Sequence, residues 1–133
     1  MGETRSIRDR FPLPWRTEKT PGGCKVTDAK GHPLAYLYAS ERPYAPQPTS
    51  AECQALAGVV CAVANGLPLV IDFERFPAPW QAVDDNTVMR IVDGHNHSLI
   101  YLYAADQVPE RALTRSECKV IAVAVCVAVG RSR

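Results

Sequence analysis

The chain has 133 residues, 47% of them apolar, and a formal net charge of +1. This length allows one domain, and the apolar share is ordinary for a globular protein. The nearly balanced charge creates no strong field that would favour nucleic acid, so we expect no nucleic-acid partner. No stretch of about 18 apolar residues is present, and the chain starts with polar residues, so we expect a cytoplasmic protein without a membrane span.

The sequence repeats itself, because residues 10–65 align with residues 75–130 without a gap. Both copies contain Phe-Pro-x-Pro-Trp, Leu-x-Tyr-Leu-Tyr-Ala and Thr-x-x-Glu-Cys. Each copy is near the size at which an isolated core is marginal, so we expect both copies to share one core in a single globular domain. The predicted divisions are a flexible tail at 1–9, a first repeat at 10–66, a linker that could add a strand at 67–74, and a second repeat at 75–130.

Each copy is expected to begin with an extended segment, because its prolines fix the backbone torsion φ. Runs of apolar and β-branched residues, separated by turn residues, then predict three strands in each copy. The aspartates Asp28 and Asp93 suit the first position of a turn, where a carboxylate accepts nearby backbone N–H groups. The predicted strands are Trp15–Lys19, Cys24–Thr27 and Pro33–Ala39 in the first copy, and Trp80–Val83, Val88–Val92 and Ser98–Ala104 in the second.

The third strand of each copy is apolar on both faces, which predicts a central position in the sheet. Alternation places two tyrosines of each copy on one face of this strand. They could line a groove for a ligand or a peptide, or cap a core with their hydroxyls towards water. Trp15 and Trp80 could likewise be docking epitopes, or each could cover an open end of the sheet. The candidate tyrosines are Tyr36, Tyr38, Tyr101 and Tyr103.

A helix is predicted at the end of each copy. Thr49-x-x-Glu52 and Thr114-x-x-Glu117 match a capping box, in which threonine caps the helix and glutamate reaches back. Asn65-Gly66 and Gly130 are predicted to be the C-terminal stops of these helices.

The apolar segment 120–129 is rich in β-branched residues that favour a strand, but the capping box and the alignment favour a helix. A helix that is apolar all round must be buried all round. We therefore expect the apolar helix at residues 114–129 to pack on its sister helix, or to bind a protein partner or form a homodimer.

The five cysteines are predicted to be reduced thiols that serve as small buried apolar residues. The spacing of the two repeated pairs differs from the C-x2-C of a zinc knuckle.

Three histidines are candidate metal ligands or general bases. His32 and His97 each follow an aspartate, Asp28 or Asp93, by four residues, and His95 lies beside His97. The alternative is that these histidines are hydrated residues at the tips of hairpins. His95 aligns with a lysine in the first copy, which weakens the case for a symmetric metal site.

Pro12–Trp15, Val26–Tyr38 and Thr49–Glu52 carry the patterns Pro-x-Pro-Trp, Val-x-Asp-Ala-x-Gly-x-x-Leu-Ala-Tyr-x-Tyr and Thr-x-x-Glu. With these patterns the chain resembles a group of small uncharacterised proteins of rhizobia and related alphaproteobacteria. The resemblance implies a bacterial origin and no particular activity. The order strand-strand-strand-helix, given twice, also resembles the YegP-like fold, which implies tandem units in one sheet with pseudo-twofold symmetry. The second copy departs from the pattern with Asp93-Gly94 in place of Asp28-Ala29.

We therefore predict an α+β fold of two tandem β-β-β-α repeats with pseudo-twofold symmetry. The repeats should share one core, in which two helices pack on an antiparallel sheet. The sequence contains no phosphate-binding loop, dinucleotide fingerprint or zinc protease helix. The leading hypothesis is a non-enzymatic binding or protein-interaction module without a cofactor or catalytic residues. The alternative is a small metal-dependent or acid/base enzyme that uses the histidines and aspartates of the hairpin tips.

Overall fold

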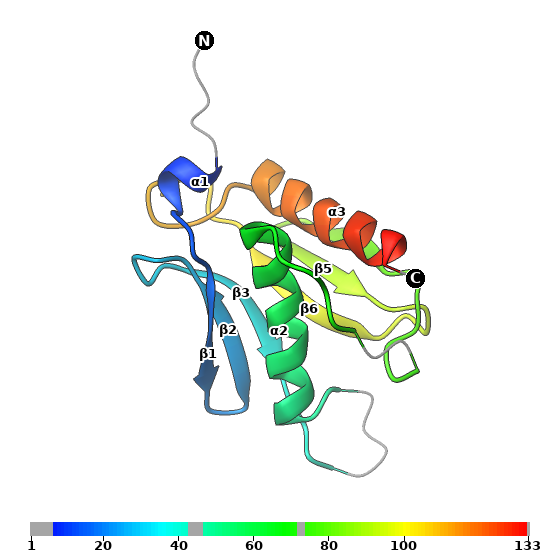
Figure 1. Ribbon diagram of the computed structural model, residues 1–133. Helices are drawn as coiled ribbons and strands as arrows, with labels where there is room; N and C mark the ends of the chain where they lie inside the picture. The colour runs from blue at the N-terminus through cyan, green and yellow to red at the C-terminus, as the bar shows by residue number, and fades with distance from the viewer. Residues whose placement is uncertain (1–6, 43–46, 72–73, 133) are drawn as a thin grey trace.

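The computed structural model describes residues 7–42, 47–71 and 74–132. It is an α+β fold in which the two long helices lie on the same face of one sheet (Figure 1). Its elements are α1 (Ile7–Arg10), β1 (Arg16–Thr20), β2 (Gly23–Thr27), β3 (Pro33–Tyr38), α2 (Ser50–Asn65), β4 (Gln81–Asp85), β5 (Val88–Val92), β6 (Ser98–Tyr103) and α3 (Arg115–Arg131).

The sheet has six strands in the order β1-β2-β3-β6-β5-β4, and every neighbouring pair is antiparallel. The predicted strands form within one or two residues of their expected ends. The third strand of each half lies at the centre, where β3 pairs with β6 at Tyr36 and Tyr101. The prediction that these two strands are central is therefore confirmed.

The core lies between the helices and one face of the sheet. Helix α2 contacts β1, β2, β3 and β6, whereas α3 contacts β4, β5 and β6. Full burial of one large aliphatic side chain contributes about 1.5–3 kcal/mol, so this layer supplies most of the driving force for folding. The largest fully buried side chains include Phe11, Leu37, Ile91, Ile100, Leu102 and Val125.

Both helices begin as predicted. The capping boxes of Thr49 with Glu52 and of Thr114 with Glu117 are complete, since each threonine side chain and each glutamate side chain accepts a backbone N–H. Gly66 ends α2 with a positive φ of 74°. The prediction that Gly130 ends the second helix is wrong, because α3 continues to Arg131.

Segment 120–129 is helical, as the capping box predicted. Within one chain, one side of this helix remains exposed, and its expected burial against a second subunit stays a prediction. Val120, Val123 and Val127 are 58%, 44% and 45% exposed along one side of α3. The helix buries its opposite side on the sheet, and α2 meets it along only part of its length.

Two segments outside the repeats differ from their predictions. Residues 7–9, expected in a flexible tail, belong to helix α1, and Ile7 packs against the core. The predicted tail residues 1–6 lie outside the described residues. Within the linker, residues 67–71 and 74 form no strand, although Leu69 and Ile71 pack against the core, and residues 72–73 lie outside the described part.

Two ion pairs connect the halves of the chain in a crossed manner. Arg10, which precedes the first sheet strand, makes a bidentate pair with Glu117 in α3, with Nη2 and Oε1 2.6 Å apart. Arg75, which aligns with Arg10, contacts Glu52 in α2 at 3.0 Å. Each arginine therefore holds the capping glutamate of the helix in the other half.

Candidate functional site

The open face of the sheet carries a cluster of four tyrosines, and we name Tyr36, Tyr38, Tyr101 and Tyr103 the tyrosine face. Their strand neighbours Ala35 and Leu37 are fully buried and point to the helices, so alternation directs the tyrosines to the other side. Tyr36 packs edge-on against Tyr103 with ring centroids 5.5 Å apart, and Tyr38 packs against Tyr101 at 5.2 Å. The structure thus brings all four predicted tyrosines together.

The hydroxyl oxygens of Tyr38 and Tyr103 lie 2.9 Å apart and share a hydrogen bond. Burial, and then the hydrogen bond with Tyr38, raise the pKa of Tyr103 to about 12. The phenol of Tyr103 therefore keeps its proton at neutral pH. Because one O–H is used between the two rings, the other can donate to an acceptor on a ligand.

Charged residues of both signs flank the tyrosines. Lys25 of β2 lies opposite Tyr36, and Glu18 of β1 lies opposite Lys25. On the other side Arg90 of β5 lies opposite Tyr101. Lys25 and Arg90 occupy aligned positions of the two copies.

Arg90 is held in place by two partners. Its Nε contacts Asp85 Oδ2 at 2.5 Å, and its Nη1 donates to Ser98 Oγ at 2.6 Å. With Glu18 beside Lys25 and Asp85 on Arg90, the charges around the tyrosine face are balanced. A hollow of about 260 Å³ borders this region and is lined by Gln47, Asn96, His97, Ser98 and Tyr101.

The first hairpin turn is closed by a buried aspartate. Asp28 Oδ1 accepts the backbone N–H groups of Lys30 and His32 at 2.9 and 2.8 Å. Its Oδ2 lies 3.0 Å from His32 Nδ1, so both carboxylate oxygens have partners. This confirms the predicted turn role of Asp28.

The second hairpin turn has the same backbone hydrogen bonds to its aspartate, but the other carboxylate oxygen has a different environment. Asp93 Oδ1 accepts the backbone N–H groups of His95 and His97 at 2.9 and 3.0 Å. Its Oδ2 is buried without a hydrogen-bond partner among the described residues, and His97 Nδ1 is 4.0 Å away. One ligand atom from each of Asp93, His95 and His97 lies within 4.8 Å of the others.

The three candidate histidines do not form one site. His32 precedes β3 and His97 precedes β6, and these strands are antiparallel around Tyr36 and Tyr101. The two hairpin turns are therefore at opposite ends of the central strand pair, so His32 cannot share a ligand with His95 and His97.

The two tryptophans are buried in the core, each only 4% exposed. The indole N–H of Trp15 donates to the carbonyl of Phe11 at 2.9 Å, and that of Trp80 donates to the carbonyl of Phe76 at 3.1 Å. The structure does not bring either tryptophan to the tyrosine face.

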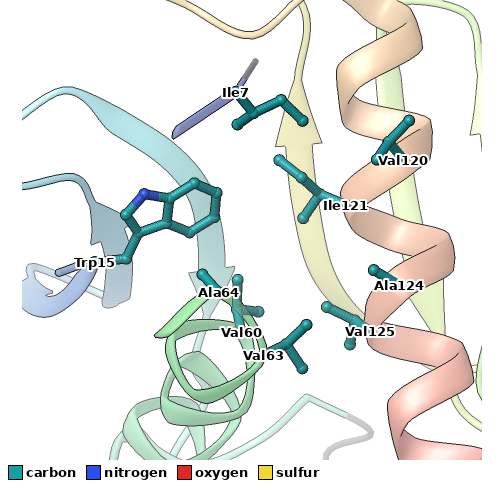
Figure 2. A pocket seen from close by; sticks show the side chains of 9 residues that line it. All are labelled: Ile7, Trp15, Val60, Val63, Ala64, Val120, Ile121, Ala124 and Val125. Carbon is teal, nitrogen blue, oxygen red and sulfur yellow. The ribbon is translucent and has the colours of Figure 1, made fainter. Parts of the chain in front are cut away.

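Trp15 lines an apolar pocket of about 150 Å³ between the two long helices. In Figure 2 side chains from α1, α2 and α3 converge on this space. Trp15 has the only polar group among the lining side chains, and its indole N–H is already bonded, so these side chains offer no polar group to orient a substrate. The lining residues are Ile7, Trp15, Val60, Val63, Ala64, Val120, Ile121, Ala124 and Val125.

The sequence interpretation did not include the residues that surround the tyrosines. The matching basic residues at aligned positions, Lys25 and Arg90, are a signal that could have identified the two flanks. Gln47 comes from a distant loop, and no local pattern predicts that it reaches the hollow beside Tyr101.

No family model, curated protein or solved structure matches this chain. Within residues 7–42, 47–71 and 74–132, the helices are too short or too polar to cross a membrane. The function proposed below therefore depends on the geometry of the tyrosine face.

Proposed function

We propose that this protein is a non-enzymatic interaction module whose tyrosine face binds an extended segment of a partner protein. One observation carries the proposal: four tyrosines from the two central strands gather on the open side of the sheet. Tyr38 and Tyr103 are 47% and 39% exposed, so a ligand can reach both residues. Tyrosine gives a large contact area at low cost in side-chain entropy, which suits it to binding surfaces.

The chemistry of the surface favours a proline-rich partner segment. Aromatic surfaces bind polyproline II helices, which are already extended and therefore lose little entropy on binding. The edge-on contacts of Tyr36 with Tyr103 and of Tyr38 with Tyr101 produce ring faces at differing tilts, against which proline rings can pack. The second hydroxyl proton of the Tyr38–Tyr103 pair can donate to a backbone carbonyl of the peptide.

The charges support a neutral segment over a charged one. Lys25 lies beside Glu18, and Arg90 pairs with Asp85, so each cation has an acidic neighbour on its own side. A strongly acidic peptide would meet Glu18 and Asp85, and a basic peptide would meet Lys25 and Arg90. A proline-rich segment without charges avoids both penalties.

The test is a titration with a short uncharged proline-rich peptide, followed by NMR chemical-shift mapping. We expect shifts concentrated at the tyrosine face, and none with a glycine–serine peptide of the same length. Tyr36→Ala combined with Tyr101→Ala should abolish these shifts while the fold is kept. Tyr36→Phe combined with Tyr101→Phe is the matched control, because it retains the rings and should retain binding.

Several results would contradict the proposal. They are binding that survives the double alanine substitution, a preference for an acidic peptide, and a preference for single-stranded nucleic acid. The absence of any shift at the tyrosine face with the proline-rich peptide would also contradict it.

We also propose that the halves are related by a pseudo-twofold axis that passes between Tyr36 and Tyr101. Three observations support this symmetry. The strand order reads β1-β2-β3 from one edge and β4-β5-β6 from the other. Tyr36 and Tyr101 are aligned in the repeat and pair with each other. The crossed ion pairs of Arg10 and Arg75 are also aligned. With this symmetry, a peptide could bind across the tyrosine face in either of two opposite chain directions with equivalent contacts.

A homodimer through the apolar helix at 114–129 is a second proposal, for a different surface. The observation that favours it is the exposed side of α3 formed by Val120, Val123 and Val127. A second copy could cover these side chains with its own, as in an isologous interface.

A further inference from the structure

We propose that Asp93, His95 and His97 form a binding site for a divalent transition-metal ion of the zinc class, in the hairpin between β5 and β6. One ligand atom from each residue lies within 4.8 Å of the others. Two imidazoles and a carboxylate are ligands that zinc accepts, and three protein ligands leave a fourth position for water or another group. The site does not require the proposed peptide binding, although His97 also lines the hollow beside Tyr101.

The first support is the orphaned oxygen of Asp93. The Asp93 side chain is fully buried, and its Oδ1 is used by the two backbone N–H groups of the turn. Within the part of the chain that the structure describes, its Oδ2 has no hydrogen-bond partner, and His97 Nδ1 is too distant at 4.0 Å. A buried carboxyl oxygen without a hydrogen-bond partner costs free energy, and a cation held between Asp93 and the histidines would remove that cost.

The second support is the aligned turn in the other half of the chain, which acts as an internal comparison. There Asp28 Oδ2 lies 3.0 Å from His32 Nδ1, so the same carboxylate oxygen is satisfied within the turn. The residue aligned with His95 is Lys30, whose positive charge would repel a metal ion. The second turn thus differs from the first both in its extra imidazole and in its unpartnered oxygen.

The exposure of the two histidine side chains fits their proposed role. Asp93 is fixed by its two backbone contacts, whereas His95 is exposed and the side chain of His97 is 40% exposed. Rotation of the two imidazoles can therefore shorten the ligand separations to those around zinc, where each Zn–N bond is about 2.0–2.1 Å. The carboxylate would need no movement, since the turn already orients it.

The test uses the full chain, without a histidine tag, titrated with Zn²⁺ in a calorimeter under reducing conditions. We expect one ion per chain. His95→Lys introduces the residue of the other turn, and Asp93→Asn keeps an oxygen for the backbone contacts. Each substitution should weaken binding by more than a factor of about ten, since losing even an outer-shell partner of a metal has that effect.

The control is His32→Gln in the first turn, which should leave the affinity for Zn²⁺ unchanged. Co²⁺ is the second probe, because thiolate ligands add an intense charge-transfer band that histidine and carboxylate ligands do not. A wild-type protein that binds no Zn²⁺ would overturn the proposal. So would binding that persists in His95→Lys, or a Co²⁺ spectrum with thiolate bands.

Discussion

The hydroxyl oxygens of Tyr38 and Tyr103 lie 2.9 Å apart, although the two residues come from different halves of the chain. Their strands are antiparallel and pair at Tyr36 and Tyr101, so Tyr38 and Tyr103 extend from that pair in opposite directions along the sheet. The two side chains therefore lean back over the centre to meet. Their contact depends on how the halves dock, and it lies on the surface proposed to bind a partner.

The first prediction concerns alkaline pH and Tyr103. Burial and the hydrogen bond with Tyr38 raise the pKa of Tyr103 to about 12, whereas the pKa of an unfolded tyrosine is about 10. At a pH between these two pKa values, Tyr103 has lost its proton in the unfolded chain but keeps it in the folded chain. The contribution of Tyr103 to stability should therefore be complete below about pH 10 and decline as the pH rises towards 12. Urea unfolding at a series of pH values measures this decline.

Tyr103→Phe separates the contribution of Tyr103 to this decline from the contributions of other side chains that titrate at alkaline pH. Cys118 is one of them, because burial raises its pKa too. The decline should be smaller in Tyr103→Phe than in the wild type. Equal declines would show that the phenol of Tyr103 is not responsible.

The second prediction concerns the ion pair between Arg10 and Glu117. Their side chains are 12% and 11% exposed, so removing Arg10 leaves a largely buried carboxylate without its partner. Arg10→Met should lower the free energy of unfolding by about 3 kcal/mol, the low end of the loss for a broken buried pair. The matched variant is Arg75→Met, where the partners are 32% and 27% exposed and the loss should be smaller.

The same pair predicts a loss of stability in acid. Burial acts to raise the pKa of Glu117, but hydrogen bonds from Arg10 and from the Thr114 backbone outweigh it and lower the pKa. The contribution of Glu117 is therefore present above the pKa of an unfolded glutamate and lost as the pH falls through the lower folded value. Chemical unfolding against pH should show less acid sensitivity in Glu117→Gln. An unchanged acid profile in that variant would argue against the assignment.

The third prediction compares two glycines. Gly66 has a positive φ of 74° at the end of α2, whereas Gly130 lies inside α3, and an added Cβ would meet no atom within 4 Å at either position. The effect of alanine should therefore come from the backbone alone. Gly66→Ala should destabilise the protein by about 1–2 kcal/mol, because an L-residue is strained there. Gly130→Ala should stabilise it by roughly 0.5–1 kcal/mol, because glycine weakens a helix interior. Thermal and urea unfolding of both variants provide the check, and shifts of the same sign would refute the comparison.

The strands and the helix starts could be predicted because their signals are local. The capping boxes at Thr49 and Thr114 need only residues within one turn, and the turn roles of Asp28 and Asp93 need only the next few residues. The end of α3 could not be predicted from Gly130 alone, because a glycine with helical neighbours can continue a helix as well as stop one.

The arrangement of the candidate sites could not be predicted from the sequence, because it depends on the tertiary structure. The sequence indicates that four tyrosines share strand faces, but not that β3 pairs with β6 so that Tyr38 reaches Tyr103. It places three histidines near aspartates, but the antiparallel centre separates His32 from His95 and His97. Asp93 Oδ2 is left without a partner because His97 Nδ1 lies 4.0 Å away, whereas His32 Nδ1 lies 3.0 Å from Asp28 Oδ2, and no spacing rule can provide such a difference.

The last prediction concerns self-association through α3. Val123 and Val127 are exposed and lie on the same side of the helix as Val120, so a second copy could bury all three. We expect the mass from light scattering to exceed 14.6 kDa and to rise with concentration. Val123→Lys combined with Val127→Lys should restore the monomer mass, with the free energy of unfolding of the monomer changed by at most about 0.5 kcal/mol per site. The matched control, Gln54→Lys on the exposed side of α2, should leave association intact. A wild-type mass of 14.6 kDa at every concentration would mean that these valines stay exposed to water in the free protein.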